Sequence, residues 1–133
     1  MTNDKNVMSK LNFDFSAIVQ NAKDVVIVTK SFPIDDLGPE IIYVNDAFTE
    51  TTGYTAEEVI GKTPRIFQKE GTDKEELSKI REALEKKEPV RVTLRNFSKT
   101  GKEYWLNISS LPLGDSEGKV THFASIQLKF TEY

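Results

Sequence analysis

The last third of the chain contains three strand patterns joined by links too short to hold a helix. Segments with alternating or β-branched residues span 89–97, 103–113 and 120–129, and glycines stand in both links, at Gly101 and at Gly114 with Gly118. Links of this length connect antiparallel neighbours, because a parallel connection needs a crossover of a dozen residues or more. This part of the chain is therefore predicted to form an antiparallel meander.

Two shorter strand patterns lie nearer the N-terminus. Val25–Thr29 and Ile41–Val44 are rich in β-branched residues, and the segment between them holds two prolines and a glycine. This composition predicts two buried strands separated by a loop. Together with the meander they predict a five-stranded antiparallel sheet.

Helices are predicted between the second and third strands. Asn45 is expected to cap a helix over residues 46–52 that stops at Gly53, and the capping box Thr55–Glu58 opens another that ends near Gly61. A second capping box, Thr72–Glu75, is expected to open the longest helix, roughly residues 73–87. The sequence thus predicts an α+β fold with short helices on one face of the sheet.

Residues 1–22 are expected to form an N-terminal cap that precedes the domain of residues 23–133. Within it, residues 11–22 place apolar side chains at helical spacing and predict an amphipathic helix, through Leu11, Phe15, Ile18 and Ala22. A chain of 133 residues suits one domain with a single core.

Composition excludes several classes of function. The chain has 18 basic and 21 acidic residues and no basic stripe, which argues against nucleic-acid binding. No apolar run approaches the ~20 residues of a membrane helix, and the N-terminus lacks a signal region, so a cytoplasmic protein is expected. The chain has no cysteine and one histidine, His122. We therefore expect no disulfide and no metal site.

One segment, Gly61-Lys62-Thr63-Pro64-Arg65-Ile66-Phe67-Gln68, resembles the flavin-binding segment Gly-x-Asn-Cys-Arg-Phe-Leu-Gln of LOV photosensors. Further motifs follow in the order and spacing of that family: Tyr43–Phe48 with Thr52–Tyr54, Gly71–Asp73, Ile80–Leu84, Leu94–Phe97 with Tyr104-Trp105, and His122–Gln127. The resemblance covers about residues 25–130 and implies the PAS fold, in its LOV subclass.

The resemblance implies a set of cofactor-binding residues. Arg65 and Arg81 match the arginines that grip the FMN phosphate, and Gln68 matches a glutamine near the pyrimidine carbonyl. Asn96 matches the first of two asparagines on the polar edge of the ring, and Gln127 matches the glutamine that faces flavin N5 and O4. Asn45 and Thr63, which belong to the matching motifs, complete the expected set together with Pro64 and Leu106.

Three of these positions depart from the family. Pro64 replaces the cysteine that forms the light-induced bond to flavin, Leu106 replaces the second asparagine, and Thr63 replaces the asparagine before the cysteine. The resemblance then implies a flavin-binding sensor of blue light, redox state or both, which acts through the flavin semiquinone without a cysteinyl adduct. FMN is expected rather than FAD, since two arginines suit a terminal phosphate, although Thr63-Pro64-Arg65 also resembles some redox PAS domains that bind FAD.

A second function is a PAS interaction module without flavin. We expect a homodimer through the N-terminal helix and the open sheet face, a possible downstream effector domain, and no enzyme activity, because no paired carboxylates, Ser-His pair or phosphate loop is present.

Three alternatives stay open when the residues are considered apart from the family resemblance. Asn96 shares a strand face with Val92 and Leu94, so its amide needs a partner, either a ligand or a backbone group. On the last strand, apolar patterning favours Ile126 inward, whereas the resemblance favours Gln127 inward, and we adopt the latter. Arg81 borders the apolar stripe of its helix and could serve a phosphate or pair with Glu85.

Overall fold

The computed structural model describes residues 22–32, 38–68 and 72–130. They form one five-stranded antiparallel sheet in the order β2-β1-β5-β4-β3, which confirms the predicted fold. The strands are β1 (Val25–Lys30), β2 (Ile41–Val44), β3 (Val90–Phe97), β4 (Glu103–Gly114) and β5 (Val120–Phe130). The helix expected over residues 11–22 lies, but for its last residue, outside the described residues.

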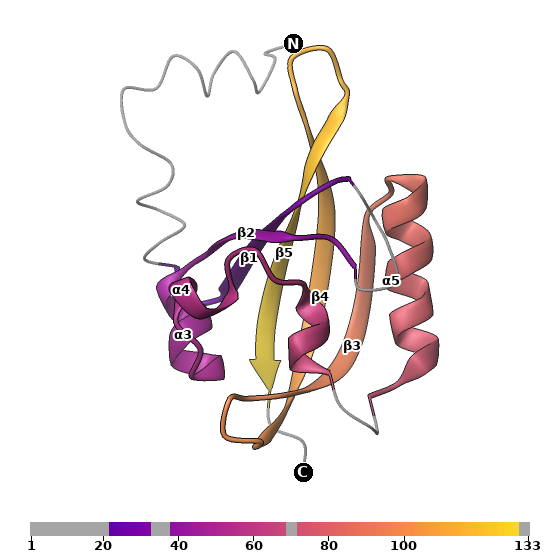
Figure 1. Cartoon of the computed structure of the whole chain (residues 1–133). Coiled ribbons are helices and arrows are strands. Elements are labelled where there is room, and N and C mark those ends of the chain that lie inside the picture. Colours follow the sequence, from indigo (N-terminus) through magenta and orange to yellow (C-terminus); the bar gives the residue numbers. More distant parts are fainter. Residues whose placement is uncertain (1–21, 33–37, 69–71, 131–133) are drawn as a thin grey trace.

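The helices gather on one face of the sheet (Figure 1). They are α3 (Asp46–Thr52), α4 (Ala56–Val59), the 3₁₀ turn η1 (Pro64–Phe67) and α5 (Lys74–Lys86). The predicted stop of α3 at Gly53 is confirmed, with φ at 79°, and so is the capping box of Thr55 and Glu58. The second capping box is wrong, since the N-cap of α5 is Asp73, whose carboxylate accepts from two backbone N–H groups, while Thr72 Oγ1 donates to the Arg95 carbonyl.

The apolar core is divided into two clusters. One joins β1 and β2 to α3, α4 and η1 through residues that include Ile27, Phe48 and Phe67. The other lies under α5, where Leu77 and Ile80 pack against buried side chains of β3 and β4. Residues of both clusters, such as Ile27 and Leu77, line one cavity, which is the candidate site.

On the other face of the sheet, described residues of β4 and β5 leave large apolar side chains exposed. Four large apolar side chains there are at least 41% exposed: Leu111, Leu113, Ile126 and Leu128. Strand register places Ala124 beside Leu111 and Ser109 beside Ile126, so the four residues belong to one continuous surface. We call these four residues the open-face patch.

Candidate functional site

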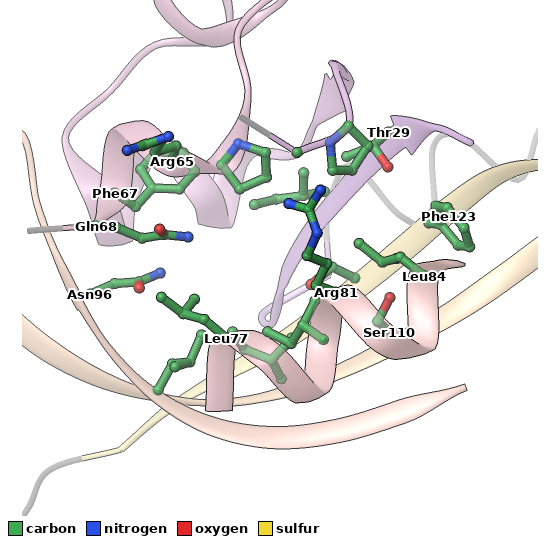
Figure 2. Close-up of a pocket in the computed structure, with 18 of the residues that line it drawn as sticks. Thr29, Arg65, Phe67, Gln68, Leu77, Arg81, Leu84, Asn96, Ser110 and Phe123 are labelled. Atoms are coloured by element: carbon green, nitrogen blue, oxygen red, sulfur yellow. The ribbon is translucent and has the colours of Figure 1, made fainter. Parts of the chain in front are cut away.

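A cavity of about 410 Å³ lies between the sheet and the helices, within the usual ~300–1,000 Å³ of ligand sites (Figure 2). Its wall is mostly apolar, with a few polar side chains converging on it from η1, α5 and the central strands. The lining residues are Ile27, Thr29, Gly38, Pro39, Pro64, Arg65, Phe67, Gln68, Leu77, Ser78, Ile80, Arg81, Leu84, Leu94, Asn96, Ile108, Ser110, Phe123, Ser125 and Gln127.

The turn η1 is held against the cavity from both of its ends. Pro64 occupies its first position, where the fixed φ of proline suits a helical start. Phe67 closes the turn and is 2% exposed, with edge-on ring contacts to Phe48 at 5.5 Å and Tyr54 at 5.8 Å. Upstream, Gly61 N–H donates to the Ile41 carbonyl at 2.9 Å, which ties the segment to β2. Pro64 is therefore fixed at the cavity wall.

Two buried polar atoms at the cavity lack a hydrogen-bond partner among the described residues. Asn96 Oδ1 on β3 and Thr29 Oγ1 on β1 are both in this state, although their residues are only 6% exposed. Such groups cost about 1–3 kcal/mol each when left unpaired. Because both residues line the cavity, a ligand with polar atoms on its rim would satisfy them.

Gln127 faces the cavity, as the family resemblance predicted. It is 9% exposed, whereas its neighbour Ile126 is 41% exposed on the opposite face. Its Nε2 donates to Ser125 Oγ at 2.9 Å. Gln68 also lines the cavity, and Figure 2 shows its amide group near that of Asn96. Three carboxamides thus meet one apolar chamber.

The two arginines line the same cavity although 16 positions separate them in the sequence. Arg81 extends from α5 and Arg65 projects from η1 (Figure 2). Arg81 Nε also donates to Glu85 Oε1 at 3.2 Å, an ion pair whose side chains are 43% and 57% exposed. An exposed ion pair of this kind contributes little to stability.

Tyr104 lies on the inner face of the sheet beside the site. It is 7% exposed, and burial raises the pKa of its phenol to about 12, opposed by a hydrogen bond from the Asn96 side chain. Trp105, by contrast, lies on the outer face, where it packs against Phe130 with ring centroids 6.4 Å apart. Of these two aromatic residues, Tyr104 is therefore the one on the cavity side of the sheet.

Three of the expected site residues do not line the cavity. Asn45 is a structural cap: its Oδ1 accepts from Val26 N–H at 3.0 Å and Phe48 N–H at 3.2 Å, and its Nδ2 donates to the Asp24 carbonyl. Leu106 is fully buried in the cluster beneath α5. Thr63 precedes η1 and makes no side-chain cap.

Three hydroxyl residues that line the cavity from the strands, Thr29, Ser110 and Ser125, were not among the expected site residues. Their signal was the period of two. Ser110 shares a face with the buried Ile108, and Ser125 shares one with Gln127. Small polar residues on a buried strand face indicate polar contact with something inside the fold.

Clusters of metal-ligating side chains and membrane-spanning helices are both absent from the described part of the chain. There, no group of three or more His, Asp or Glu side chains is placed to hold a metal ion. No helix among the described residues has the length and apolar character needed to cross a bilayer.

A family model of the PAS domain matches residues 24–129. The chain belongs to the PAS domain family. Among curated proteins, it is 38% identical over 91 residues to a blue-light-activated histidine kinase of Brucella anthropi and 36% identical over 93 residues to phototropin-2 of Oryza sativa subsp. japonica. These alignments cover 68% and 70% of this chain but only 18% and 10% of the two relatives.

Similar solved structures indicate the LOV subclass of the PAS family. The LOV domain from Erythrobacter litoralis EL346 blue-light activated histidine kinase superposes with a TM-score of 0.76 at 28% identity, over 84% of this chain and 100% of that one. A structure described as "Flavin Analogue Sheds Light on Light-Oxygen-Voltage Domain Mechanism" superposes with a TM-score of 0.79 at 30% identity, over 91% of this chain and 87% of that one. The protein is thus a LOV-like PAS domain, and one without cysteine.

Proposed function

We propose that this chain is a flavin-binding sensory domain that responds to blue light, redox state or both without a cysteinyl adduct. The observation that carries the proposal is a pair of buried polar atoms, Asn96 Oδ1 and Thr29 Oγ1, which have no hydrogen-bond partner among the described residues and belong to the wall of a mostly apolar cavity. A flavin ring has two flat apolar faces and a rim of N–H, nitrogen and carbonyl groups, which matches this distribution.

FMN, the proposed cofactor, supplies blue-light absorption and the capacity to accept electrons. In this chain, Asn96 and Gln68 would hold the polar rim of the ring, and Gln127 would lie at its other polar end. Arg65 and Arg81 would receive the phosphate, since guanidinium groups bind phosphate oxygens in pairs. A terminal phosphate is present in FMN and not in FAD, which is why FMN is preferred.

Pro64 removes the nucleophile at the cavity wall, so the response must depend on electron and proton transfer instead. Gln127 carries both a hydrogen-bond donor and an acceptor on one rotatable amide group. Rotation of this group can therefore match a change of protonation in the ligand. Its strand runs on to Phe130, which contacts Trp105 on the outer face. A downstream effector domain, of the kind named in the histidine kinase relatives, would receive the change from this end of β5.

The test is spectroscopic. Purified protein, or protein incubated with FMN, should show a flavin band in the blue that bleaches under light with an electron donor present. Replacing both Asn96 and Gln68 with leucine should weaken FMN binding at least about tenfold, because two hydrogen bonds to the ring are lost. Protein that stays colourless and takes up no added FMN, FAD or riboflavin would refute the proposal.

A second function, homodimerisation, is favoured by the open-face patch. Its four exposed apolar side chains lie on adjacent strands, and a two-fold axis would set this surface against the same surface of a second copy. We propose that the residues preceding β1 contribute to the same interface, since their apolar spacing predicts an amphipathic helix. Signalling and dimerisation are compatible, because the cavity and the patch lie on opposite faces.

A further inference from the structure

The side-chain amide of Gln127 is oriented by another side chain of its own strand. Gln127 Nε2 donates to Ser125 Oγ at 2.9 Å, and both residues line the cavity. They are two positions apart on β5 and therefore point to the same face of the sheet. With Nε2 turned back along the strand, the carbonyl Oε1 is the arm of the amide that remains for a ligand.

Strand register explains why Ser125 is the partner. Directly across from Gln127 stand Val25 on β1 and Ile108 on β4, which offer no polar side-chain atom. Ser125 is the adjacent inward residue of the same strand, and its hydroxyl both accepts and donates. The orientation of the Gln127 amide thus depends on one hydroxyl group.

Resting on the flavin-binding function proposed above, we propose that Ser125 is a positioning residue that presents the Gln127 carbonyl to the ligand and so favours reduced over oxidised flavin. Oxidised flavin has a bare nitrogen at N5, which accepts a hydrogen bond. Two-electron reduction, here by dithionite, adds a proton at N5 and turns it into a donor. A fixed Oε1 pairs with the N–H of the reduced ring and meets the lone pair of the oxidised ring.

The orientation of the amide is tested on flavin-free protein, independently of cofactor binding. Nitrogen-resolved NMR should show the two Gln127 Nε2 protons as distinct signals with slow solvent exchange. Ser125→Ala should accelerate that exchange, and Ser125→Thr, which keeps the hydroxyl, should retain the slow exchange. Ser109→Ala is the matched control, because it removes the same hydroxyl from the opposite face of the sheet. Unchanged exchange in Ser125→Ala would overturn the proposal.

The preference for reduced flavin is tested by measuring FMN affinity in both redox states. Ser125→Ala should lower the ratio of reduced to oxidised affinity about threefold to tenfold, the usual effect of one hydrogen bond. For a two-electron couple this lowers the midpoint potential of bound FMN by about 15–30 mV. Ser125→Thr should restore the ratio, and Ser109→Ala should not change it.

A constant ratio across Ser125→Ala would refute the positioning role even where the protein binds FMN well. Absence of FMN binding in the unsubstituted protein would refute the proposed function instead. In that case, the exchange measurement on flavin-free protein would still decide whether Ser125 orients Gln127.

Discussion

Asn96 of β3 and Tyr104 of β4 are direct cross-strand partners on the inner face of the sheet. The Asn96 side chain acts as a hydrogen-bond donor toward the phenol, and its own carbonyl Oδ1 has no partner among the described residues. Asn96 lines the cavity, and Tyr104 lies directly across from it on the neighbouring strand. Among the described residues, Asn96 Oδ1 is therefore a buried acceptor at the cavity that could receive an N–H group of a ligand.

Tyr104→Phe should change the alkaline stability of the protein. The folded pKa of Tyr104 is about 12, above the unfolded value of 10.0, so the folded state holds its proton while the unfolded state releases it. The contribution of Tyr104 to the free energy of unfolding is fully present below pH 10. It is lost as the pH rises toward 12, by about 2 to 3 kcal/mol in total. Denaturant unfolding at several pH values should show this loss, and Tyr104→Phe should flatten it. Parallel curves for the two proteins would contradict the raised pKa.

Asn45→Ala should destabilise the fold without changing the chemistry of the cavity. Asn45 is 1% exposed and serves two backbone N–H groups and one carbonyl, so its removal leaves buried groups unpaired at a cost of about 2–4 kcal/mol. Denaturant midpoints should fall accordingly, while FMN affinity of the folded protein stays within about twofold. Asn107→Ala, at an exposed position on the opposite face, is the control. A selective loss of FMN affinity would restore Asn45 to the binding site.

The sequence predicted those features that depend on local pattern. Short glycine links made the meander antiparallel, and Gly53 ended α3 because its φ of 79° is open to glycine at little cost. Asn96 was correctly placed inward by its alternation with Val92 and Leu94. Gln127 needed the family resemblance, because apolar patterning alone favoured Ile126 inward and could not show that the outer face of β5 is also apolar.

Features that depend on tertiary contacts were missed. Asn45 was correctly predicted to cap α3, but it was also expected at the cofactor; it does not line the cavity, and its side chain also bonds to backbone groups of Asp24 and Val26. Thr72 was expected to cap α5, but the nearby Arg95 carbonyl takes its hydroxyl and Asp73 becomes the cap. Thr29 alternates with the buried Val25 and Ile27, but this alternation gives only its inward direction, and that the inward face at this point lines a cavity depends on the packing of the helices.

Arg81→Ala and Arg65→Ala should weaken binding of FMN much more than binding of riboflavin. Hydrogen bonds to a charged group are the strong ones, so a lost phosphate contact should cost about 10- to 100-fold in FMN affinity. Riboflavin has no phosphate, and its affinity should change less than about threefold. Arg91→Ala, an exposed arginine of β3 outside the cavity, is the control. Equal losses for both ligands would assign the two arginines to packing.

Ile126→Glu with Leu128→Glu should convert a dimer into a monomer. Both residues belong to the open-face patch and are 41% and 52% exposed, so charge there costs the isolated domain little but repels a second copy. Light scattering coupled to size exclusion measures the mass of each form. Lys102→Glu, an exposed change in the β3–β4 turn, controls for added charge. A protein that is monomeric before substitution would refute the homodimer. In that case, we would expect the residues that precede β1 to cover the open-face patch.

Pro64→Cys should introduce the covalent photochemistry that this chain lacks. Pro64 lies at the cavity wall in a turn that Phe67 and Gly61 fix, so a thiol at this position faces the proposed ring. A cysteine thiol is a strong nucleophile, and proline at the first position of a turn can be replaced at a cost of about 1 kcal/mol or less. Under blue light the FMN-loaded variant should lose its blue band, gain a near-ultraviolet band and recover in the dark. Pro64→Ser, similar in size to cysteine but with no thiol, should show neither change. If both variants behave alike while binding FMN, residue 64 does not reach the reactive carbon, and the ring must lie in the cavity in another orientation.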